Sequence, residues 1–353
     1  MGTKSKTPDA NDQRSERMGA ILTEPVTGRV AWKGKELAQD DSWLYRLSPR
    51  AVGELETAAY AVERRGLPLF RIRREDFPLP GFGEELKKIS EELESGRGFV
   101  QVKGLPIERY TLQQAKLIYW GIGTHLGEAV SQNARGDLLG DVKDEGLDIR
   151  AARVRGYQTR AVSPFHVDET DVVGLLCWRP SKSGGASLIA SSTALYNELL
   201  RRYPWYVGVL YNRFSYDWRG EQPKGGSPIY RWPVFEYFDG KLSCRYSRRM
   251  IEFAQQTTGT MLTGLEREAF DTMDSLIEEL KLNISFEPGD MQFLNNYVIL
   301  HSRTAFEDYP EPDRKRHLLR LWLTVPDGRR FSPETLRERD VRLGVPVAEP
   351  AMG

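Results

Sequence analysis

Apolar residues recur at helical spacing in the first half of the chain and predict three helices. Ser48-Pro49 fits an N-cap and first turn, and apolar positions then repeat every three or four residues until Gly66, so a helix is expected over 48–65. A charged amphipathic helix is expected over 83–93 and a more apolar one over 112–126. The run 98–102 between them is typical of a strand.

The second half of the chain contains short apolar and aromatic segments separated by Gly, Pro and Asp-Gly, a pattern typical of β-strands. Helices are expected over 193–202 and 262–281. The expected strands are 188–191, 207–211, 214–216, 234–238, 242–244, 284–286, 291–294 and 318–325. Many short strands with helices outside them predict an α+β fold around a β-sandwich core, of which the jelly roll is one form.

The domain organisation follows from composition along the chain. No change of composition divides the middle of the sequence, so a single domain is expected over 60–340, preceded by an N-terminal extension over 18–59. Residues 1–17 are polar and charged, which predicts a disordered tail, and 341–353 are expected to form a C-terminal tail. The segment 133–154 is rich in Gly, Asp and Arg and is expected to be a long loop or lid.

Composition excludes several classes of partner. The formal net charge is 0, so no overall basic field indicates nucleic acid or an anionic membrane as a partner. The 2 cysteines are too few for a disulfide framework or a Cys-rich zinc site. Residues 1–17 lack the apolar stretch of a signal peptide, and no run approaches the ~20 apolar residues of a membrane-spanning helix. A cytoplasmic protein acting on a small molecule is expected, and a homo-oligomer stays open.

The candidate chemistry begins with His166-Val167-Asp168, just ahead of the apolar run 172–178. Residues i and i+2 of an extended segment point to the same side, so His166 and Asp168 offer an imidazole nitrogen and a carboxylate oxygen to one point in space. A second, distant histidine would complete the 2-His-1-carboxylate set that suits a non-haem Fe(II) with open coordination positions. Taken alone, a histidine near an apolar strand is more often a hydrogen-bonded structural residue.

The chain has 4 histidines, so the third ligand is sought among few residues. His301 follows a turn, a strand-like segment and a short apolar run, which places it near a strand end. His125 closes a predicted helix and is expected to be structural. His317 alternates with Arg316 at the start of the last strand, so it is expected to face the opposite side and not to be a ligand.

Two arginines at the last strand are candidate anion-binding residues. Arg316 and Arg320 are an even number of residues apart, so both face the same side of a strand, with Leu318 between them. Arginine presents a planar fork that suits bidentate binding of a carboxylate. The ordinary alternative is that Arg314-Lys315-Arg316 is a solvated basic run.

Five elements in order carry a resemblance to a known family: His166-Val167-Asp168, Gly184-Gly185-Ala186-Ser187, Pro288-Gly289-Asp290, His301, and Arg316 with Arg320. Over roughly residues 60–326 the chain resembles the taurine-dioxygenase/TfdA-type family of Fe(II)- and 2-oxoglutarate-dependent dioxygenases. The resemblance implies a double-stranded β-helix core (jelly-roll, cupin-like) with surrounding helices. The domain over 60–340 is then an oxygenase domain.

The resemblance also implies roles for single residues. His166, Asp168 and His301 are then the catalytic iron ligands. Arg316 matches the arginine that binds the distal carboxylate of 2-oxoglutarate, and Ser187 matches the hydroxyl residue that shares it, where taurine dioxygenase itself has threonine. The expected cofactors are Fe(II), the co-substrate 2-oxoglutarate and O2. The expected reaction is hydroxylation, or desaturation, of a small polar or anionic metabolite with release of succinate and CO2.

Four residues are candidates for contact with the prime substrate. Arg320 matches an arginine that meets an anionic substrate group in some family members. Asn133 opens the expected lid, Tyr157 is one of several aromatic residues, and Asp171 lies next to the metal motif. A loop amide facing water, a core aromatic and a solvated carboxylate are the ordinary alternatives for these last three.

Two other functions stay open. A non-oxidative, cupin-type protein that binds a metal or small ligand would keep the jelly roll, but it has no need of a carboxylate-binding arginine pair at the last strand. Binding of 2-oxoglutarate separates the two hypotheses. A zinc hydrolase is disfavoured, because no His-Glu-x-x-His helix supplies a general-base glutamate.

Overall fold

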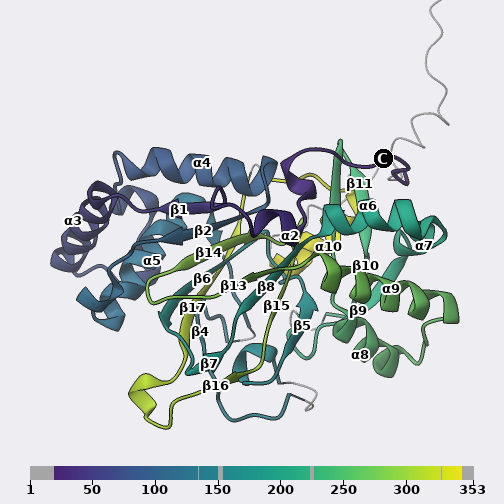
Figure 1. Ribbon diagram of the computed structural model, residues 1–353. Coiled ribbons are helices and arrows are strands. Elements are labelled where there is room, and N and C mark those ends of the chain that lie inside the picture. The colour runs from purple at the N-terminus through teal and green to yellow at the C-terminus, as the bar shows by residue number, and fades with distance from the viewer. Residues whose placement is uncertain (1–19, 134, 150–153, 223–225, 327, 344–353) are drawn as a thin grey trace, which may run out of the picture.

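Two facing β-sheets form the centre of the computed structural model, which describes residues 20–343 except 134, 150–153, 223–225 and 327 (Figure 1). The larger sheet has seven strands in the order β1-β2-β14-β6-β17-β3, with β4 also paired to β17, and the smaller sheet has the order β13-β8-β15-β5. The tail predicted over 1–17 and all but the first three residues of the tail predicted over 341–353 lie outside the described residues.

The strands of the larger sheet are β1 (Leu44–Arg46), β2 (Phe99–Lys103), β3 (Glu128–Ala129), β4 (Leu139–Val142), β6 (Val172–Arg179), β14 (Met291–Asn295) and β17 (His317–Thr324). Those of the smaller sheet are β5 (Ser163–His166), β8 (Ser187–Ser191), β13 (Leu282–Ile284) and β15 (Ile299–Arg303). Three short ribbons complete the β structure: β7 (Ser183–Gly184) with β16 (Phe306–Glu307), β9 (Arg213–Asp217) with β10 (Ile229–Pro233), and β11 (Phe235–Phe238) with β12 (Lys241–Cys244).

A shared apolar core holds the two sheets together. Val173 and Trp322 of the larger sheet belong to one buried cluster with Ile189 and Ile299 of the smaller sheet. Burial of large apolar side chains stabilises such a face-to-face arrangement by roughly 1.5–3 kcal/mol for each one. The α+β prediction with a double-stranded β-helix core is confirmed.

Three helices cover the outer face of the larger sheet, as Figure 1 shows: α3 (Pro49–Arg65), α4 (Phe82–Ser95) and α5 (Leu112–Leu126). All three were predicted, with bounds that differ by at most two residues. The start of α3 follows from capping, because the Ser48 hydroxyl accepts a hydrogen bond from the backbone of Ala51 at 3.1 Å. Its end follows from Gly66, which takes a left-handed conformation with φ 62°.

A second group of helices packs with the ribbons beside the smaller sheet (Figure 1): α6 (Ser192–Arg202), α7 (Pro204–Leu210), α8 (Arg248–Thr258), α9 (Gly264–Leu280) and α10 (Pro333–Leu343). The strand predicted over 207–211 is wrong, because α7 occupies these residues up to Leu210. Pro204 is compatible with the first turn of a helix, and Val207 and Leu210, three residues apart, supply its buried side.

The remaining helical segments are short: η1 (Arg29–Ala31), α2 (Gly34–Leu37), η2 (Leu69–Arg71), η3 (Arg74–Asp76), η4 (Ile107–Arg109), η5 (Gly156–Gln158) and η6 (Pro312–Arg314). The long loop predicted over 133–154 is wrong in part, because β4 lies within it and pairs with β17. Four residues without strong periodicity form this strand because β17 offers a backbone edge there.

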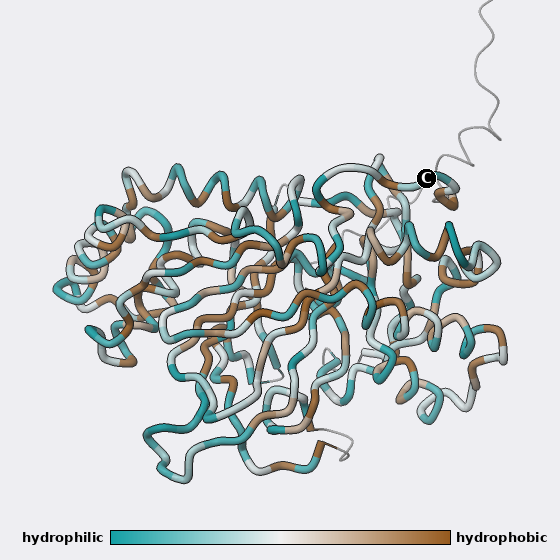
Figure 2. Tube along the Cα trace, viewed as in Figure 1, coloured by the Kyte–Doolittle hydropathy of each residue, from teal (hydrophilic) through white to brown (hydrophobic). Residues whose placement is uncertain are grey.

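Figure 2 shows the hydrophobic segments concentrated in the central strands and the hydrophilic ones in outer loops and helix surfaces. Within the described residues, no helix combines the length and the apolar character needed to cross a bilayer.

Candidate active site

The two sheet strands that carry the predicted histidine ligands are neighbours. His166 ends β5, His301 lies in β15, and the two residues are directly opposite each other in the antiparallel ladder. Asp168 follows β5 by two residues, and its backbone N–H donates to Asn296 Oδ1 at 3.0 Å. The cross-strand register therefore brings together two residues that are far apart in sequence.

The ligand atoms of His166, Asp168 and His301 all lie within 4.8 Å of one another. Asp168 Oδ1 is 3.7 Å from His166 Nε2, and Asp168 Oδ2 is 3.8 Å from His301 Nε2. Atoms bound to one ion at about 2.1 Å lie at most about 4.2 Å apart, so these two separations fit a shared metal. The His166 Nδ1–H donates to the Pro164 carbonyl at 2.8 Å, which leaves Nε2 for a metal.

The protonation states of Asp168 and His301 also suit metal binding. Burial alone would raise the pKa of Asp168, but Arg320, His301, His166 and a hydrogen bond from Trp322 together lower it to about 2. Burial, together with the neighbouring His166, lowers the pKa of His301 to about 3. At neutral pH the carboxylate is charged and the His301 imidazole is neutral, as metal ligands must be.

A buried arginine opens onto the same cavity as the three ligands. Arg316 is 4% exposed, and its Nη1 has no hydrogen-bond partner in the part of the chain that the structure describes. Burial lowers the pKa of Arg316 to about 10, so the guanidinium remains charged at neutral pH. A buried guanidinium N–H without a hydrogen-bond acceptor is costly, and a carboxylate from a ligand would satisfy it.

Ser187 and Gly185 line the cavity close to Arg316. The Ser187 hydroxyl donates to Gln292 Oε1 at 2.8 Å. Gly185 has φ 72°, and a Cβ built on it would lie 3.2 Å from Arg316 Nε. The absence of a side chain at Gly185 thus leaves room for the Arg316 guanidinium.

Alternation along β17 arranges the side chains of this wall. Arg316, Leu318, Arg320 and Trp322 all line the cavity. His317 faces the other side, where its Nε2 lies 2.8 Å from Asp141 Oδ1. The shared face of Arg316 and Arg320 was predicted from the alternation, and the structure places both there.

Arg320 is held next to the metal ligands. Its Nε donates to Gln132 Oε1 at 2.7 Å, and its Nη1 lies 3.8 Å from Asp168 Oδ2. The guanidinium carbon is 4.7 Å from the ring centre of Tyr157 and 4.8 Å from that of Trp322. These contacts fix a positive charge beside the candidate metal position.

The other candidate substrate residues occupy different places. Tyr157 lines the cavity through its position in η5. Asn133 lies in a polar hollow that adjoins the cavity and donates to Asp137 Oδ2 at 2.8 Å. Asp171 lies outside the cavity lining, where it accepts from the Tyr297 hydroxyl at 2.8 Å and forms an ion pair with Arg339.

Two residues that support the metal ligands, Trp322 and Asn296, were not predicted from the sequence. Trp322 Nε1 donates to Asp168 Oδ2 at 2.9 Å, and its place two residues beyond Arg320 was a usable signal. Asn296, which holds the backbone of Asp168, gave no local signal. His125, predicted to be structural, has its Nε2 2.8 Å from the Phe77 carbonyl.

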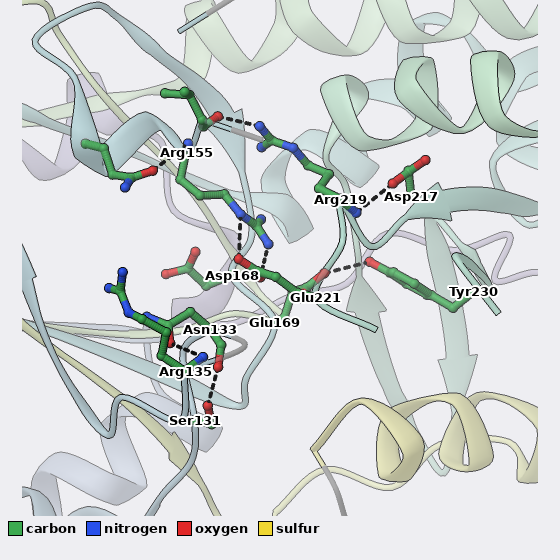
Figure 3. A network of polar contacts seen from close by, with 12 residues as sticks. Ser131, Asn133, Arg135, Arg155, Asp168, Glu169, Asp217, Arg219, Glu221 and Tyr230 are labelled. Atoms are coloured by element: carbon green, nitrogen blue, oxygen red, sulfur yellow. Dashed lines mark hydrogen bonds and ion pairs between the residues drawn. The ribbon is translucent and has the colours of Figure 1, made fainter. Parts of the chain in front are cut away.

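A further polar network extends along the wall beside Asp168, as Figure 3 shows. Glu169 lines the cavity and accepts hydrogen bonds from the Tyr230 hydroxyl at 3.1 Å and from Arg245 at 3.2 Å. Arg155 donates through Nε to Glu221 at 3.2 Å. Of these residues, the sequence patterns singled out Glu169 alone, as a neighbour of the metal motif that could touch substrate or be solvated.

Comparison with known proteins gives one family. The model of the family described as taurine catabolism dioxygenase TauD, TfdA family matches residues 63–322. FR-33289 synthase of Streptomyces rubellomurinus is 36% identical over 322 residues, covering 89% of this chain and 94% of that protein. Taurine hydroxylase-like protein SAT17 of Stachybotrys chartarum is 29% identical over 311 residues, covering 85% of this chain and 80% of that protein.

Solved structures show the same fold at low identity. Asparagine oxygenase in complex with Fe(II), 2S,3S-3-hydroxyasparagine and succinate superposes with a TM-score of 0.62 at 16% identity, covering 80% of this chain and 93% of that one. The non-haem iron oxygenase OrfP in complex with Fe and alpha-ketoglutaric acid superposes with a TM-score of 0.59 at 13% sequence identity. The match covers 80% of this chain and 94% of that one. The chain belongs to the taurine catabolism dioxygenase TauD, TfdA family and is an Fe(II)- and 2-oxoglutarate-dependent dioxygenase.

Proposed function

We propose that His166, Asp168 and His301 hold the Fe(II), that Arg316 and Ser187 bind the distal carboxylate of 2-oxoglutarate, and that the enzyme hydroxylates a small anionic substrate in the cavity beside them. The observation that carries this proposal is the convergence of the three ligand atoms within 4.8 Å at the cavity onto which the buried Arg316 opens.

The bound iron would supply the activation of O2, which converts 2-oxoglutarate to succinate and CO2 while the second oxygen atom hydroxylates a substrate C–H bond. The protein's own residues would prepare this reaction. Trp322 holds Asp168 through Oδ2, and the Pro164 carbonyl fixes the tautomer of His166. Arg316 and Ser187 would orient 2-oxoglutarate by binding its distal carboxylate.

The anionic character of the substrate is supported by Arg320. This residue is fixed by Gln132, Tyr157 and Trp322 at the metal end of the cavity. Small polar substrates agree with the solved neighbours, whose complexes contain hydroxyasparagine or L-Arg. Tyr157 would contact the substrate across the guanidinium of Arg320, and Asn133 would act from the adjoining hollow. Because Asp171 is paired with Arg339, we propose that it supports the site from behind rather than touching substrate.

The experiment that tests the proposal measures succinate release from 2-oxoglutarate by the Fe(II)-loaded protein across a panel of small sulfonates, carboxylates, phosphonates and amino acids. We expect release to be stimulated by an anionic member of the panel and to be lost in Asp168→Ala. Full turnover by Asp168→Ala would show that the ligand assignment is wrong. 2-Oxoglutarate binding that is unchanged in Arg316→Gln would show that the co-substrate assignment is wrong.

A further inference from the structure

The C-terminal helix α10 lies beyond the part of the chain that the family model matches, which ends at residue 322. Figure 1 shows this helix close to β10, against which it packs. Among its residues Thr335 alone is buried, while Leu336 and Val341 are each 41% exposed. A helix with so small an apolar face gains little from hydrophobic burial, so polar contacts hold it in place.

One of these contacts joins α10 to the loop between β5 and β6, which carries the metal ligand Asp168. Arg339 donates through Nε to Asp171 Oδ1 at 3.1 Å and through Nη2 to Asp171 Oδ2, so the ion pair is bidentate. Both side chains are largely buried, with 15% of Arg339 and 9% of Asp171 exposed. Removal of either partner would leave the other charge buried and unpaired, which is strongly destabilising. Arg339 therefore links the end of the chain firmly to the metal-ligand loop.

The Asp171 carboxylate binds donors from three parts of the chain. Besides the two groups of Arg339, it accepts the Tyr297 hydroxyl at 2.8 Å and the Val325 backbone N–H at 2.9 Å. A carboxylate has about four acceptor sites, so these donors satisfy it and fix its position. Phe331, which precedes α10, has its ring centre 4.7 Å from that of Tyr297. The C-terminal segment thus reaches Asp171 both directly and through Tyr297.

Asn296 connects the position of Asp171 to that of the metal ligand. Its backbone N–H donates to the Asp171 carbonyl at 2.9 Å, and its side-chain Oδ1 accepts the Asp168 backbone N–H at 3.0 Å. One residue therefore holds both ends of the turn that begins at Asp168. Within this turn, the Thr170 hydroxyl donates to the Leu323 carbonyl at 2.7 Å and ties it to the end of β17. A shift of Asp171 would consequently move the backbone that carries the ligand carboxylate.

We propose that Arg339 of α10 is a positioning residue for the iron centre, which acts through Asp171 to hold the Asp168 carboxylate where it binds the metal. This inference rests on the proposed function, because it takes Asp168 as an iron ligand. Residues that support a metal ligand from outside the coordination sphere change metal affinity about 10- to 100-fold when they are removed. Arg339 acts one residue further out, so we expect its removal to weaken metal binding about three- to tenfold.

The coupling acts in both directions, because two linked equilibria stabilise each other by the same factor. Metal binding should order Asp168, and through Asp171 it should hold Arg339 and the helix that carries it. We therefore expect hydrogen exchange of the α10 amides to be slowed by metal in the wild type and not in Arg339→Gln. The amides of α3, on the outer face of the larger sheet, should respond to metal alike in the two proteins.

The test is calorimetric titration of the full-length protein with Mn(II), well below the Tm of every variant. We expect Arg339→Gln to bind Mn(II) about three- to tenfold more weakly than the wild type. Arg339→Lys keeps the charge without the bidentate contact, so its affinity should lie between the two. Arg337→Gln, at an exposed position of the same helix, is the matched control and should bind as the wild type does. Leu55→Ala in α3 should lower Tm without changing the Mn(II) affinity.

A double-mutant cycle tests whether Arg339 acts through Asp171. Asp171→Asn alone should weaken Mn(II) binding, and the variant that combines it with Arg339→Gln should bind no more weakly than Asp171→Asn does. Losses that add up in the double variant would overturn the inference, because the two residues would then act separately.

Three other results would overturn it. They are an unchanged Mn(II) affinity in Arg339→Gln, an equal loss of affinity in Leu55→Ala, and metal-dependent protection of α10 that persists in Arg339→Gln. Normal Mn(II) binding by Asp168→Ala would instead count against the proposed function. Loss of Mn(II) binding in Asp168→Ala, together with an unchanged affinity in Arg339→Gln, would count against the positioning role of Arg339 alone.

Discussion

Replacing Arg316 by methionine should remove 2-oxoglutarate binding and at the same time stabilise the ligand-free protein. Burial lowers the pKa of Arg316 from its ordinary value to about 10. At about 1.4 kcal/mol per unit, holding this charge in the folded state costs roughly 3 kcal/mol at every pH below about 10. Methionine removes that cost. It also removes the contact of the guanidinium with the Phe306 ring at 5.0 Å, worth about 1 kcal/mol.

The free energy of unfolding of the ligand-free Arg316→Met variant should therefore rise by about 2 kcal/mol, which should raise Tm by a few degrees. The 2-oxoglutarate affinity should fall at least ~30-fold, equivalent to about 2 kcal/mol, because a buried carboxylate would lose its charged partner. Differential scanning calorimetry of the metal-free protein measures the first effect, and titration calorimetry of the Mn(II)-loaded protein measures the second. Arg314→Met, at an exposed position two residues away, is the control and should change neither.

An Arg316→Met variant that binds 2-oxoglutarate as tightly as the wild type would show that Arg316 does not bind the co-substrate. A variant that unfolds several degrees below the wild type would show that the buried charge is stabilising in the absence of ligand.

Three further predictions concern the surroundings of the site. Trp322→Phe removes the hydrogen bond to Asp168 and should weaken Fe(II) binding about 10- to 100-fold, measured by competition with a chelator. An Fe(II) affinity equal to that of the wild type would show that this hydrogen bond does not support the ligand. Gly185→Ala should lose about 1–3 kcal/mol of unfolding free energy, measured in urea, and should weaken 2-oxoglutarate binding, because the residue has φ 72° and its Cβ would approach Arg316. Wild-type stability together with wild-type 2-oxoglutarate affinity would contradict this close approach. The hydrogen bond from His317 holds the pKa of Asp141 at about 2, below its unfolded value of 3.8, so its contribution to stability is present above pH 3.8 and lost as the pH falls through about 2. Asp141→Asn should therefore lower Tm at pH 7 and lower it less at pH 3. An equal loss of Tm at the two pH values would contradict this prediction.

Local sequence signals were sufficient for the helices on the larger sheet and for the spacing within the site. Ser48 and Gly66 mark both ends of α3, because a side-chain cap and a left-handed glycine are local features. The two-residue repeat of strands predicted that Arg316 and Arg320 share a face, and both line the cavity.

Features that depend on partners distant in sequence were not predictable in this way. Residues 207–210 are apolar enough for a strand, but in the structure they form α7, packed among the other helices. β4 forms because β17 offers an unpaired edge, which its own sequence does not reveal. Asn296 supports Asp168 across 128 residues of sequence, so no local spacing rule connects the two residues.

The assignment of the iron ligands can be tested with the 4 histidines of the chain. Fe(II) content after anaerobic loading and desalting would be measured for the four single variants to alanine. We expect His166→Ala and His301→Ala to lose the metal. We expect His125→Ala and His317→Ala, which remove hydrogen bonds to Phe77 and Asp141, to retain one Fe(II) per chain. Retention of Fe(II) by either of the first two variants, with loss in either of the last two, would contradict this assignment.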